Sequence, residues 1–553
     1  MLRFSGFNIG RPAKAFVAIL ALAGVLGACG KNGSDSGVVV EEATPVSLSM
    51  VKIGSFDGGV LGASEITAYD SASRRLFVVN GANATVDVLD ISNPANPIKV
   101  GAITVLAIGG AVNSVAVDNG LVALAVEANP KTSPGSVALY NAADLRQIQV
   151  IQVGAQPDMI AFSPDGRFIL TANEGEPNSY GLPTSIDPEG SISVITVNRS
   201  GPSLVATADF RAFNGQEAAL RAQGIRIFGP GASVAQDLEP EYIAVSPDSR
   251  TAYVTLQENN AIAIVDIATA RVTSLRPLGF KDHNVAGNGL DASDEDGGIN
   301  TDTGTPSIKI QPYPVRGMYM PDAVALFSVN NTNYLITANE GDARADWPGF
   351  NEETRVRAHC TNGLDPNVFP DALNLIRDSN LGRLRITTTP NGGRDGKNAL
   401  GQCNELWSLG ARSFTIWNTD IQRQFDSGDD IERRTTNLPN VLFNASHDNN
   451  TLDNRSPSKG PEPEGVTVAK FGKKTFAFIG LERAGGVMVY DVSVPTAATF
   501  VNYLNTRTAA TGDRGPEGLT FIPANRSPNG SPLLIVANEV SGTTAIFQIN
   551  LAY

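Results

Sequence analysis

The chain has 553 residues, 42% of them hydrophobic, and is therefore long enough to bury a large core. Its formal net charge of −14 argues against nucleic acid as a partner, because phosphate backbones are bound by clustered Lys and Arg side chains. An acidic surface of this kind fits a secreted protein or one that collects cations.

Residues 1–28 have the pattern of an export signal. Three basic residues precede the apolar run 16–27, which is too short to span a bilayer as a mature helix. The run ends in Leu26-Gly27-Ala28-Cys29, which resembles the lipobox of bacterial lipoproteins, so Cys29 is the expected lipidation site. An ordinary secretory signal cut near Ala28 is the alternative.

Residues 29–45 are small, polar and acidic, and they predict a flexible tether between the lipid and the folded body. Gly30 rather than Asp follows the cysteine. In an envelope with two membranes this favours anchoring in the outer membrane, on its periplasmic or its surface side. The membrane, through this anchor, is thus one expected partner.

Residues 46–553 repeat one pattern of short alternating strands, which is typical of β-structure. The first strand of each repeat starts with an acidic or polar residue, and the second often ends in Ala-Asn-Glu. Seven first strands are recognisable, at 65–69, 114–117, 157–162, 240–245, 321–326, 463–468 and 516–521. Repeats of about 50 residues with four strands each predict propeller blades.

The fold class is therefore predicted to be all-β, a single seven-bladed β-propeller. The last repeat ends after its third strand, and Val46 to Phe56 has the composition of the missing fourth strand. We expect it to complete the last blade and close the ring. An eight-bladed ring and two stacked sheets are the alternatives.

In a propeller the start of the first strand and the end of the second lie on the same face. Twelve acids occupy these positions and should surround one mouth of the central channel: Glu65, Asp158, Glu241, Asp322, Glu464, Glu517, Glu127, Glu174, Glu258, Glu340, Glu482 and Glu539. The long insertions 175–189, 198–238, 280–320, 341–410 and 420–462 should emerge there too. Elaborated loops on one face of a scaffold are typical of binding folds.

Like charges this close raise one another's pKa unless a cation compensates them. Calcium takes six to eight oxygen ligands, so Ca²⁺ is the first candidate and iron the second. The expected ligands are Asp158, Glu241, Asp322, Glu464, Glu517, Glu174, Glu340 and Glu539. The Asp-rich loop 291–296 offers similar chemistry without the spacing of an EF-hand. Alternatively, the acids are structural and bond backbone N–H groups of neighbouring blades.

Arginines accompany the acids in the pattern, and Arg with a divalent ion can hold a phosphoryl group. The candidates for binding a phosphorylated substrate are Arg344, Arg412, Arg483 and Arg514, with Arg455 nearby. Simple pairing of these arginines with the acids is the alternative. His447 is the one histidine considered as a metal ligand or general acid, and a structural role is the alternative.

The two remaining cysteines, Cys360 and Cys403, lie within the long insertion 341–410. An exported location is oxidising, so we expect them to form a disulfide. Two free thiols are the alternative.

Longer motifs carry a family resemblance. The segments 462–466, 480–483, 512–518 and 535–548, together with 171–176 and 337–344, resemble the choice-of-anchor I propeller family. The resemblance runs from about residue 45 to the end and implies a propeller ectodomain with an anchor that varies between members. Some bacterial members are labelled atypical alkaline phosphatases, and animal relatives are called mesenchyme-specific surface glycoproteins.

Two functions follow as hypotheses. One is a metal-dependent phosphoesterase of the cell envelope, in which metal-bound water attacks a phosphorylated substrate. The other is a non-catalytic binding or adhesion module for a glycan, peptide or protein ligand. Fold does not separate them, since propellers host both. A quinone- or sugar-oxidising propeller is less favoured because no cofactor signature is present.

Overall fold

Alternation of apolar and polar residues dominates the chain, and the computed structural model forms strands from it. The structure describes residues 43–297, 304–390 and 395–553. The predicted signal 1–28, Cys29 and most of the predicted tether 29–45 lie outside the described residues. Among the described residues, no helix has both the length and the apolar character needed to cross a membrane.

Seven four-stranded antiparallel sheets form the body of the described chain. Four of them are β2 (Thr67–Asp70), β3 (Arg75–Asn80), β4 (Thr85–Asp90) and β5 (Ile98–Thr104); β6 (Ala111–Asp118), β7 (Leu121–Glu127), β8 (Pro134–Asn141) and β9 (Gln147–Ala155); β10 (Pro157–Phe162), β11 (Phe168–Asn173), β12 (Ser191–Thr196) and β13 (Leu204–Asp209); and β14 (Pro240–Val245), β15 (Thr251–Leu256), β16 (Ala261–Asp266) and β17 (Arg271–Pro277). The other three are β20 (Val324–Val329), β21 (Thr332–Ala338), β25 (Phe414–Asn418) and β26 (Arg423–Asp426); β27 (Pro463–Phe471), β28 (Lys474–Leu481), β29 (Val487–Asp491) and β30 (Thr499–Leu504); and β33 (Pro516–Ile522), β34 (Leu533–Asn538), β35 (Thr543–Ala552) and β1 (Ser47–Asp57).

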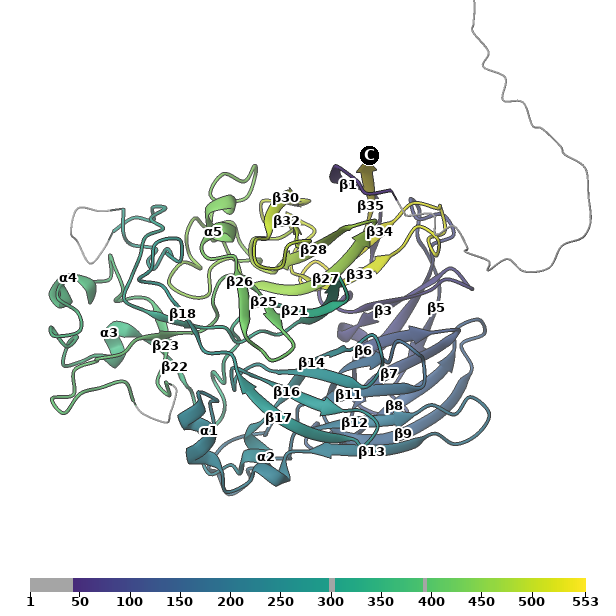
Figure 1. The fold of residues 1–553 in the computed structure, drawn as a ribbon, viewed down its shortest axis with the longest axis horizontal. Coiled ribbons are helices and arrows are strands. Elements are labelled where there is room, and N and C mark those ends of the chain that lie inside the picture. The colour runs from purple at the N-terminus through teal and green to yellow at the C-terminus, as the bar shows by residue number, and fades with distance from the viewer. Residues whose placement is uncertain (1–42, 298–303, 391–394) are drawn as a thin grey trace, which may run out of the picture. The chain divides into compact units, whose positions relative to one another are not determined.

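The innermost strands of these sheets form a closed circle. Each of β2, β6, β10, β14, β20 and β27 contacts the next, and β33 contacts β2 again. Sheets arranged radially in this way are the blades of a β-propeller, and Figure 1 shows them grouped around the inner strands. The predicted all-β propeller is therefore confirmed.

The last sheet is completed from the other end of the chain. Strand β1 pairs antiparallel with β35, with Ser47 opposite Ala552 and Asp57 opposite Thr543. Leu48 and Met50 of β1 are buried against Phe547 of β35 and Phe476 of the preceding sheet. The predicted closure of the ring is thus present, and β35 has no exposed edge at the seam.

The core lies between the faces of neighbouring sheets. One apolar cluster joins Phe77 and Val86 of the first sheet to Val122 and Leu124 of the second. Successive side chains of a strand point to opposite faces of its sheet, so each sheet contributes apolar side chains to the clusters on both of its faces. This packing fixes the inner strands and hence the residues at their ends.

The other elements lie in the connections between the strands of these sheets: η1 (Gly81–Asn83), η2 (Arg211–Phe213), α1 (Glu217–Gln223), α2 (Val234–Asp237), β18 (Phe280–Asp282), β19 (Arg316–Met318), β22 (Glu353–Arg355), α3 (Val356–His359), α4 (Ala372–Leu375), β23 (Arg385–Thr387), β24 (Trp407–Ser408), α5 (Asp430–Thr435), β31 (Arg507–Thr508) and β32 (Thr511–Gly512). Two predicted boundaries need correction. The ranges 198–238 and 420–462 are not wholly insertions, because they begin with the outer strands β13 and β26. Outer strands are largely exposed, so their apolar alternation is weak; Leu204 of β13 is 72% exposed.

The insertion 341–410 links β21 to β25 and has an apolar core of its own. Val356, Phe369 and Leu384 pack there with Leu290 and Tyr313 from the 280–320 segment. Cys360 and Cys403, both buried in this core, form a disulfide with Cα atoms 5.5 Å apart. In Figure 1 the elements α3, α4, β22 and β23 stand to one side of the sheets.

Candidate functional site

The acids that open the inner strands lie in a recurring backbone irregularity. Pro157 pairs with Asn173, and the register then shifts before Ile160, so that Asp158 falls within the shift. The same irregularity follows the first prolines of β14, β27 and β33 and contains Glu241, Glu464 and Glu517. A bulge re-aims side chains and is common at functional rims.

The acids at the ends of the second strands lie beside them. Because Pro157 faces Asn173 across the ladder, Glu174 follows at the same end of the blade as Asp158. The carboxylates also act on one another across the channel. Burial raises the pKa of Glu517 well above its usual range, and the charges of Glu539, Glu65 and Asp322 raise it further.

The starts of the first strands and the ends of the second strands together give fourteen positions at the mouth, and two of them carry no acid. Asn113 lies in the register shift of β6, where other blades place Asp or Glu, and its amide Nδ2 donates to the Pro157 carbonyl oxygen at 3.2 Å. Gly81 follows Asn80 at the end of β3, where other blades place Glu. The twelve predicted acids therefore come from all seven blades and lie at a single mouth. The first two blades contribute one acid each, and the other five contribute two each.

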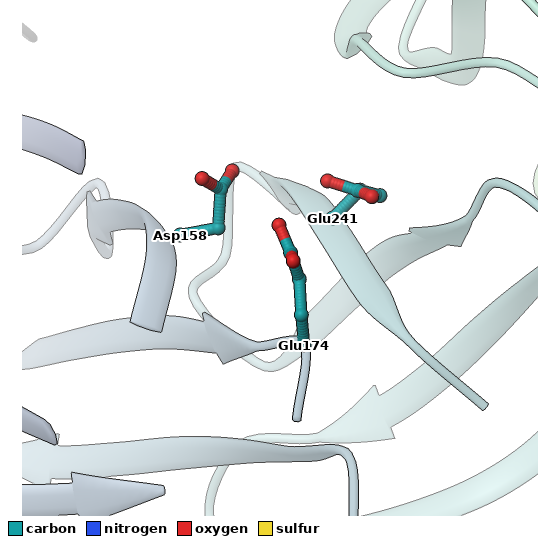
Figure 2. A group of neighbouring side chains, drawn as sticks. All are labelled: Asp158, Glu174 and Glu241. Atoms are coloured by element: carbon teal, nitrogen blue, oxygen red, sulfur yellow. The ribbon is translucent and has the colours of Figure 1, made fainter. Parts of the chain in front are cut away.

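Asp158, Glu174 and Glu241 form the first of two close groups at the mouth, here called the first triad. One carboxylate oxygen from each lies within 4.8 Å of the others. Figure 2 shows the three carboxyl groups turned toward a common space from strand starts on two blades and the strand end between them. Within the described residues, no Lys, Arg or His forms an ion pair with any of the three.

Burial and mutual repulsion set the protonation of the first triad. Burial raises the pKa of Asp158 to about 7, and the charges of Glu176 and Glu127 contribute. Burial also raises the pKa of Glu241 well above its usual range, with Glu174 as the largest charged contributor. Three carboxyl groups whose pKa values are raised by burial and by one another, with no basic partner in the described chain, offer a site for a cation.

Glu340, Glu464 and Glu482 form the second triad, again with carboxylate oxygens within 4.8 Å of one another. Here basic side chains are present: Lys459 Nζ lies 2.9 Å from Glu340 Oε1, and His447 Nδ1 lies 3.0 Å from Glu482 Oε1. Burial still raises the pKa of Glu464 well above its usual range. The second triad is thus partly neutralised by protein, unlike the first.

The family model of the choice-of-anchor I domain matches residues 65–495, which include both triads. The chain belongs to the choice-of-anchor I domain family.

Two curated animal proteins are related to this choice-of-anchor I chain. Gigasin-3a of Magallana gigas is 30% identical over 203 residues, which are 33% of this chain and 67% of that protein. The mesenchyme-specific cell surface glycoprotein of Strongylocentrotus purpuratus is 26% identical over 331 residues, or 52% of this chain and 40% of that protein. The chain thus spans less than half of the urchin protein.

Solved structures that align with the chain are more distant. The hydrazine synthase of Kuenenia stuttgartiensis aligns with a TM-score of 0.45 at 14% identity, covering 93% of this chain and 98% of that one. The WD40 domain of Toxoplasma gondii coronin aligns with a TM-score of 0.45 at 7% identity, covering 93% and 89% of the two chains.

Two of the four predicted substrate-binding arginines hold the choice-of-anchor I fold together instead. Arg344 is 3% exposed, and its guanidinium donates to Glu239 and to both the side chain and the carbonyl of Asp237. Arg412 is 4% exposed and donates to Glu432 and to the carbonyl oxygens of three loop residues. These contacts favour the alternative of pairing within the protein for both arginines.

The other two predicted arginines border the second triad. Arg483 Nε donates to Glu462 Oε2 at 3.0 Å, and its Nη1 lies 2.8 Å from His447 Nε2. Arg514 Nη1 donates to the His447 carbonyl oxygen at 3.1 Å, while its buried Nε has no hydrogen-bond partner in the described part of the chain. His447 is therefore held by protein contacts on both sides.

The Asp-rich loop 291–296 lies apart from both triads. Asp294 and Glu295 of this loop form ion pairs with Arg383 of the long insertion, and Asp291 is completely buried. None of them belongs to either triad, because the 280–320 segment packs on the insertion core.

Two glutamates that matter to the site were missed. Glu239 pairs with Arg344, and Glu462 pairs with Arg455, Arg483 and Lys459. Each is buried and lies two residues before a mouth acid, in the repeated triplet Glu-Pro-Glu at 239–241 and 462–464. That repetition was the available signal: one glutamate of each triplet anchors a loop by ion pairing and the other faces the channel.

Below the mouth the channel becomes apolar. A cavity of about 330 Å³ is lined by residues of β2, β6, β10 and β33, among them Val115, Ile160 and Phe521. The lining of this cavity has no carboxylate, so the acids lie at the mouth rather than in this part of the channel.

Proposed function

We propose that this protein is an exported propeller module, held in the bacterial envelope by lipid on Cys29, whose channel mouth binds a divalent cation and presents it to a surface ligand. One observation carries the proposal: the first triad brings three carboxylates within 4.8 Å with no basic partner among the described residues. A cation is the simplest compensation for such a group.

The donor set favours calcium over iron. Asp158, Glu174 and Glu241 offer oxygen only, and no histidine belongs to either triad. Carboxylate oxygens suit Ca²⁺, Mg²⁺ and Mn²⁺, whereas non-haem iron sites combine histidine with carboxylate. Nearby oxygens add to the set: Glu258 is 8% exposed, and its Oε2 has no partner within the described chain. In this proposal Asp322, Glu517 and Glu539 extend the acidic mouth around the bound ion.

The binding role is supported by the distribution of positive charge. Arg344 and Arg412, two of the four predicted phosphate ligands, already donate to acids of the protein itself, which supports a binding role over phosphate chemistry. The urchin relative is named a cell surface glycoprotein, which agrees with a module that acts outside the cell. A glycan, peptide or protein ligand with oxygen groups to complete the coordination of the cation fits this mouth.

Calorimetric titration tests the proposal. The propeller, residues 30–553, is stripped with chelator and titrated with Ca²⁺, and the variant Glu174→Gln is titrated in parallel. We expect saturable binding that Glu174→Gln abolishes. Asp144→Asn, on an exposed turn, is the matched control and should bind as the wild type does. Equal binding by wild type and Glu174→Gln would contradict the proposal.

A metal-dependent phosphoesterase is the second candidate. The observation that favours it is Arg514, whose buried Nε lacks a partner in the described chain, next to Arg483 and His447 at the second triad. In that role a cation at the mouth would polarise the phosphoryl group, and Arg514 would bind its oxygens. Turnover of a chromogenic phosphomonoester that is lost with chelator and with Arg514→Gln would establish it. Absence of turnover would contradict this second candidate and leave the binding module as the proposed function.

A further inference from the structure

The apolar cavity in the channel lies toward the face opposite the acidic mouth. Each inner strand runs from the mouth to a turn on that opposite face, for example 71–74 after β2 and 523–532 after β33. This face is here called the turn face. The cavity is lined by the last residues of β33 and by Pro523 and Arg526 in the turn that follows. The cavity of about 330 Å³ therefore reaches the turn face and is separate from both triads.

The wall of the cavity is mostly hydrocarbon. Ile66, Val115, Val117, Met159, Ile160 and Phe521 contribute to it. Two threonines in the wall satisfy each other, because Thr67 Oγ1 lies 2.8 Å from Thr520 Oγ1, which donates to the Thr67 carbonyl oxygen at 2.7 Å. An apolar cavity of about 150 Å³ holds benzene, so this one can hold an apolar body of about ten to twelve carbon atoms.

Two polar groups that line the cavity near the turn face lack a partner. Tyr69 is 7% exposed, and its hydroxyl has no hydrogen-bond partner within the described chain. Buried tyrosine hydroxyls usually have one. Arg526 is exposed, and its backbone N–H donates to the Pro523 carbonyl oxygen. Its guanidinium forms no hydrogen bond or ion pair with any residue that the structure describes.

The two groups act on each other electrostatically. Burial raises the pKa of Tyr69, whereas the charges of Arg74 and Arg526 lower it. The hydroxyl therefore keeps its proton at neutral pH and remains a donor. Asp70, whose charge also acts on Tyr69, accepts hydrogen bonds from the backbone N–H and the hydroxyl of Ser73. Two donors at the end of an apolar cavity are suited to the carboxylate of an amphipathic ligand.

We propose that the turn-face end of the channel binds a medium-chain carboxylate, with its hydrocarbon chain in the cavity and its carboxylate bound by Arg526 and the Tyr69 hydroxyl. The hydrocarbon wall selects for an apolar chain, and the free guanidinium selects for an anion over a neutral head group. Pockets of this kind combine apolar lining with a few polar groups that fix the orientation of the ligand. This site needs no cation and goes beyond the function proposed for the mouth.

Calorimetric titration with decanoate, below the concentration at which it forms micelles, tests the proposal. Chelator is present throughout, so that the mouth is free of cations. We expect one decanoate per chain, and affinity about tenfold lower in Arg526→Gln, which corresponds to the loss of about one charged hydrogen bond. Arg250→Gln, an exposed arginine on the equivalent turn between β14 and β15 and outside the cavity lining, is the matched control and should bind as the wild type does.

Two further titrations separate the chain from the carboxylate. 1-Decanol, which has no charge, should bind wild type and Arg526→Gln with equal affinity. Ala161 lines the cavity and is half-buried, so Ala161→Leu should fill part of the cavity and weaken binding of both ligands. If Ala161→Leu does not fold, the comparison of Arg526→Gln with Arg250→Gln decides. Absence of saturable decanoate binding, or equal affinity of wild type and Arg526→Gln for decanoate, would overturn this inference and leave the cation site at the mouth untouched.

Discussion

Lys459 Nζ lies 2.9 Å from Glu340 Oε1 and 3.4 Å from Glu462 Oε2, and it makes the two triads chemically different. Burial alone would lower the pKa of Lys459, but Glu340 and Glu462 raise it well above its usual range. The lysine is therefore charged at neutral pH and neutralises one side of the mouth. The first triad has no such partner within the described chain.

Lys459→Gln should therefore destabilise the metal-free protein and add a second cation site at the mouth. Removing one partner of a buried ion pair costs about 3 kcal/mol, because the other charge stays buried. Denaturant unfolding with chelator measures the loss, and titration with Ca²⁺ measures the added site. Arg146→Gln breaks an exposed pair and should change the unfolding free energy by less than about 0.5 kcal/mol. Unchanged stability and stoichiometry in Lys459→Gln would refute this view of the mouth.

Closure of the ring by β1 gives a second prediction. Leu48 is 5% exposed against the last two blades, so Leu48→Ala should lower the free energy of unfolding by about 3 kcal/mol. Val51 in the same strand is 46% exposed, and Val51→Ala should cost less than about 0.5 kcal/mol. Equal effects of the two substitutions would mean that the strand does not hold the seam.

The acidity of the mouth predicts how stability depends on pH. Burial, with Glu539 and Asp158, raises the pKa of Glu65 to about 8 in the folded protein. Its pKa in the unfolded chain is about 4.3, so between these values the folded state binds more protons than the unfolded state. The free energy of unfolding should therefore fall as pH rises from about 4.3 to about 8.

Glu65→Gln should reduce that fall. The measurement is denaturant unfolding with chelator at several values of pH between 5 and 8. The control is Glu217→Gln on helix α1, because backbone hydrogen bonds lower the pKa of Glu217 and the substitution should leave the slope between pH 5 and 8 unchanged. Identical slopes for Glu65→Gln and the wild type would show that Glu65 is ionised throughout.

The disulfide should protect the long insertion rather than the propeller. Cys360 and Cys403 are 43 residues apart, and closing a loop of this length is worth about 4 kcal/mol in the chain-entropy account. Cys360→Ser with Cys403→Ser should open the insertion to protease, because its core is separate from those of the blades. If protease cleaved the blades of this double variant as fast as the insertion, the expectation would be wrong.

The blades could be read from the sequence because each strand is short and alternates, and because Pro-acid starts and Asn-Glu ends recur. The inner strands predicted at 157–162 and 240–245 coincide with β10 and β14. The outer strands β13 and β26 alternate only weakly and lie within ranges predicted as insertions.

The candidate site was only partly predictable. The ring of acids follows from blade geometry, so residues such as Asp158 and Glu517 could be placed at the mouth. The partners of Arg344 and Arg412 could not, since ion pairs such as Arg344 with Asp237 join residues more than a hundred positions apart. Lys459 lies in an irregular segment, and irregular backbone has no periodicity from which to infer burial.

The most direct measurement is a crystal structure of the propeller, soaked in Ca²⁺ or in Mn²⁺ as an anomalous scatterer. The account predicts an anomalous peak among the carboxylates of Asp158, Glu174 and Glu241, with oxygen ligands at about 2.3–2.6 Å for calcium. If these carboxylates are ordered but no anomalous peak appears at the first triad, at a metal concentration that saturates other sites, the account is contradicted.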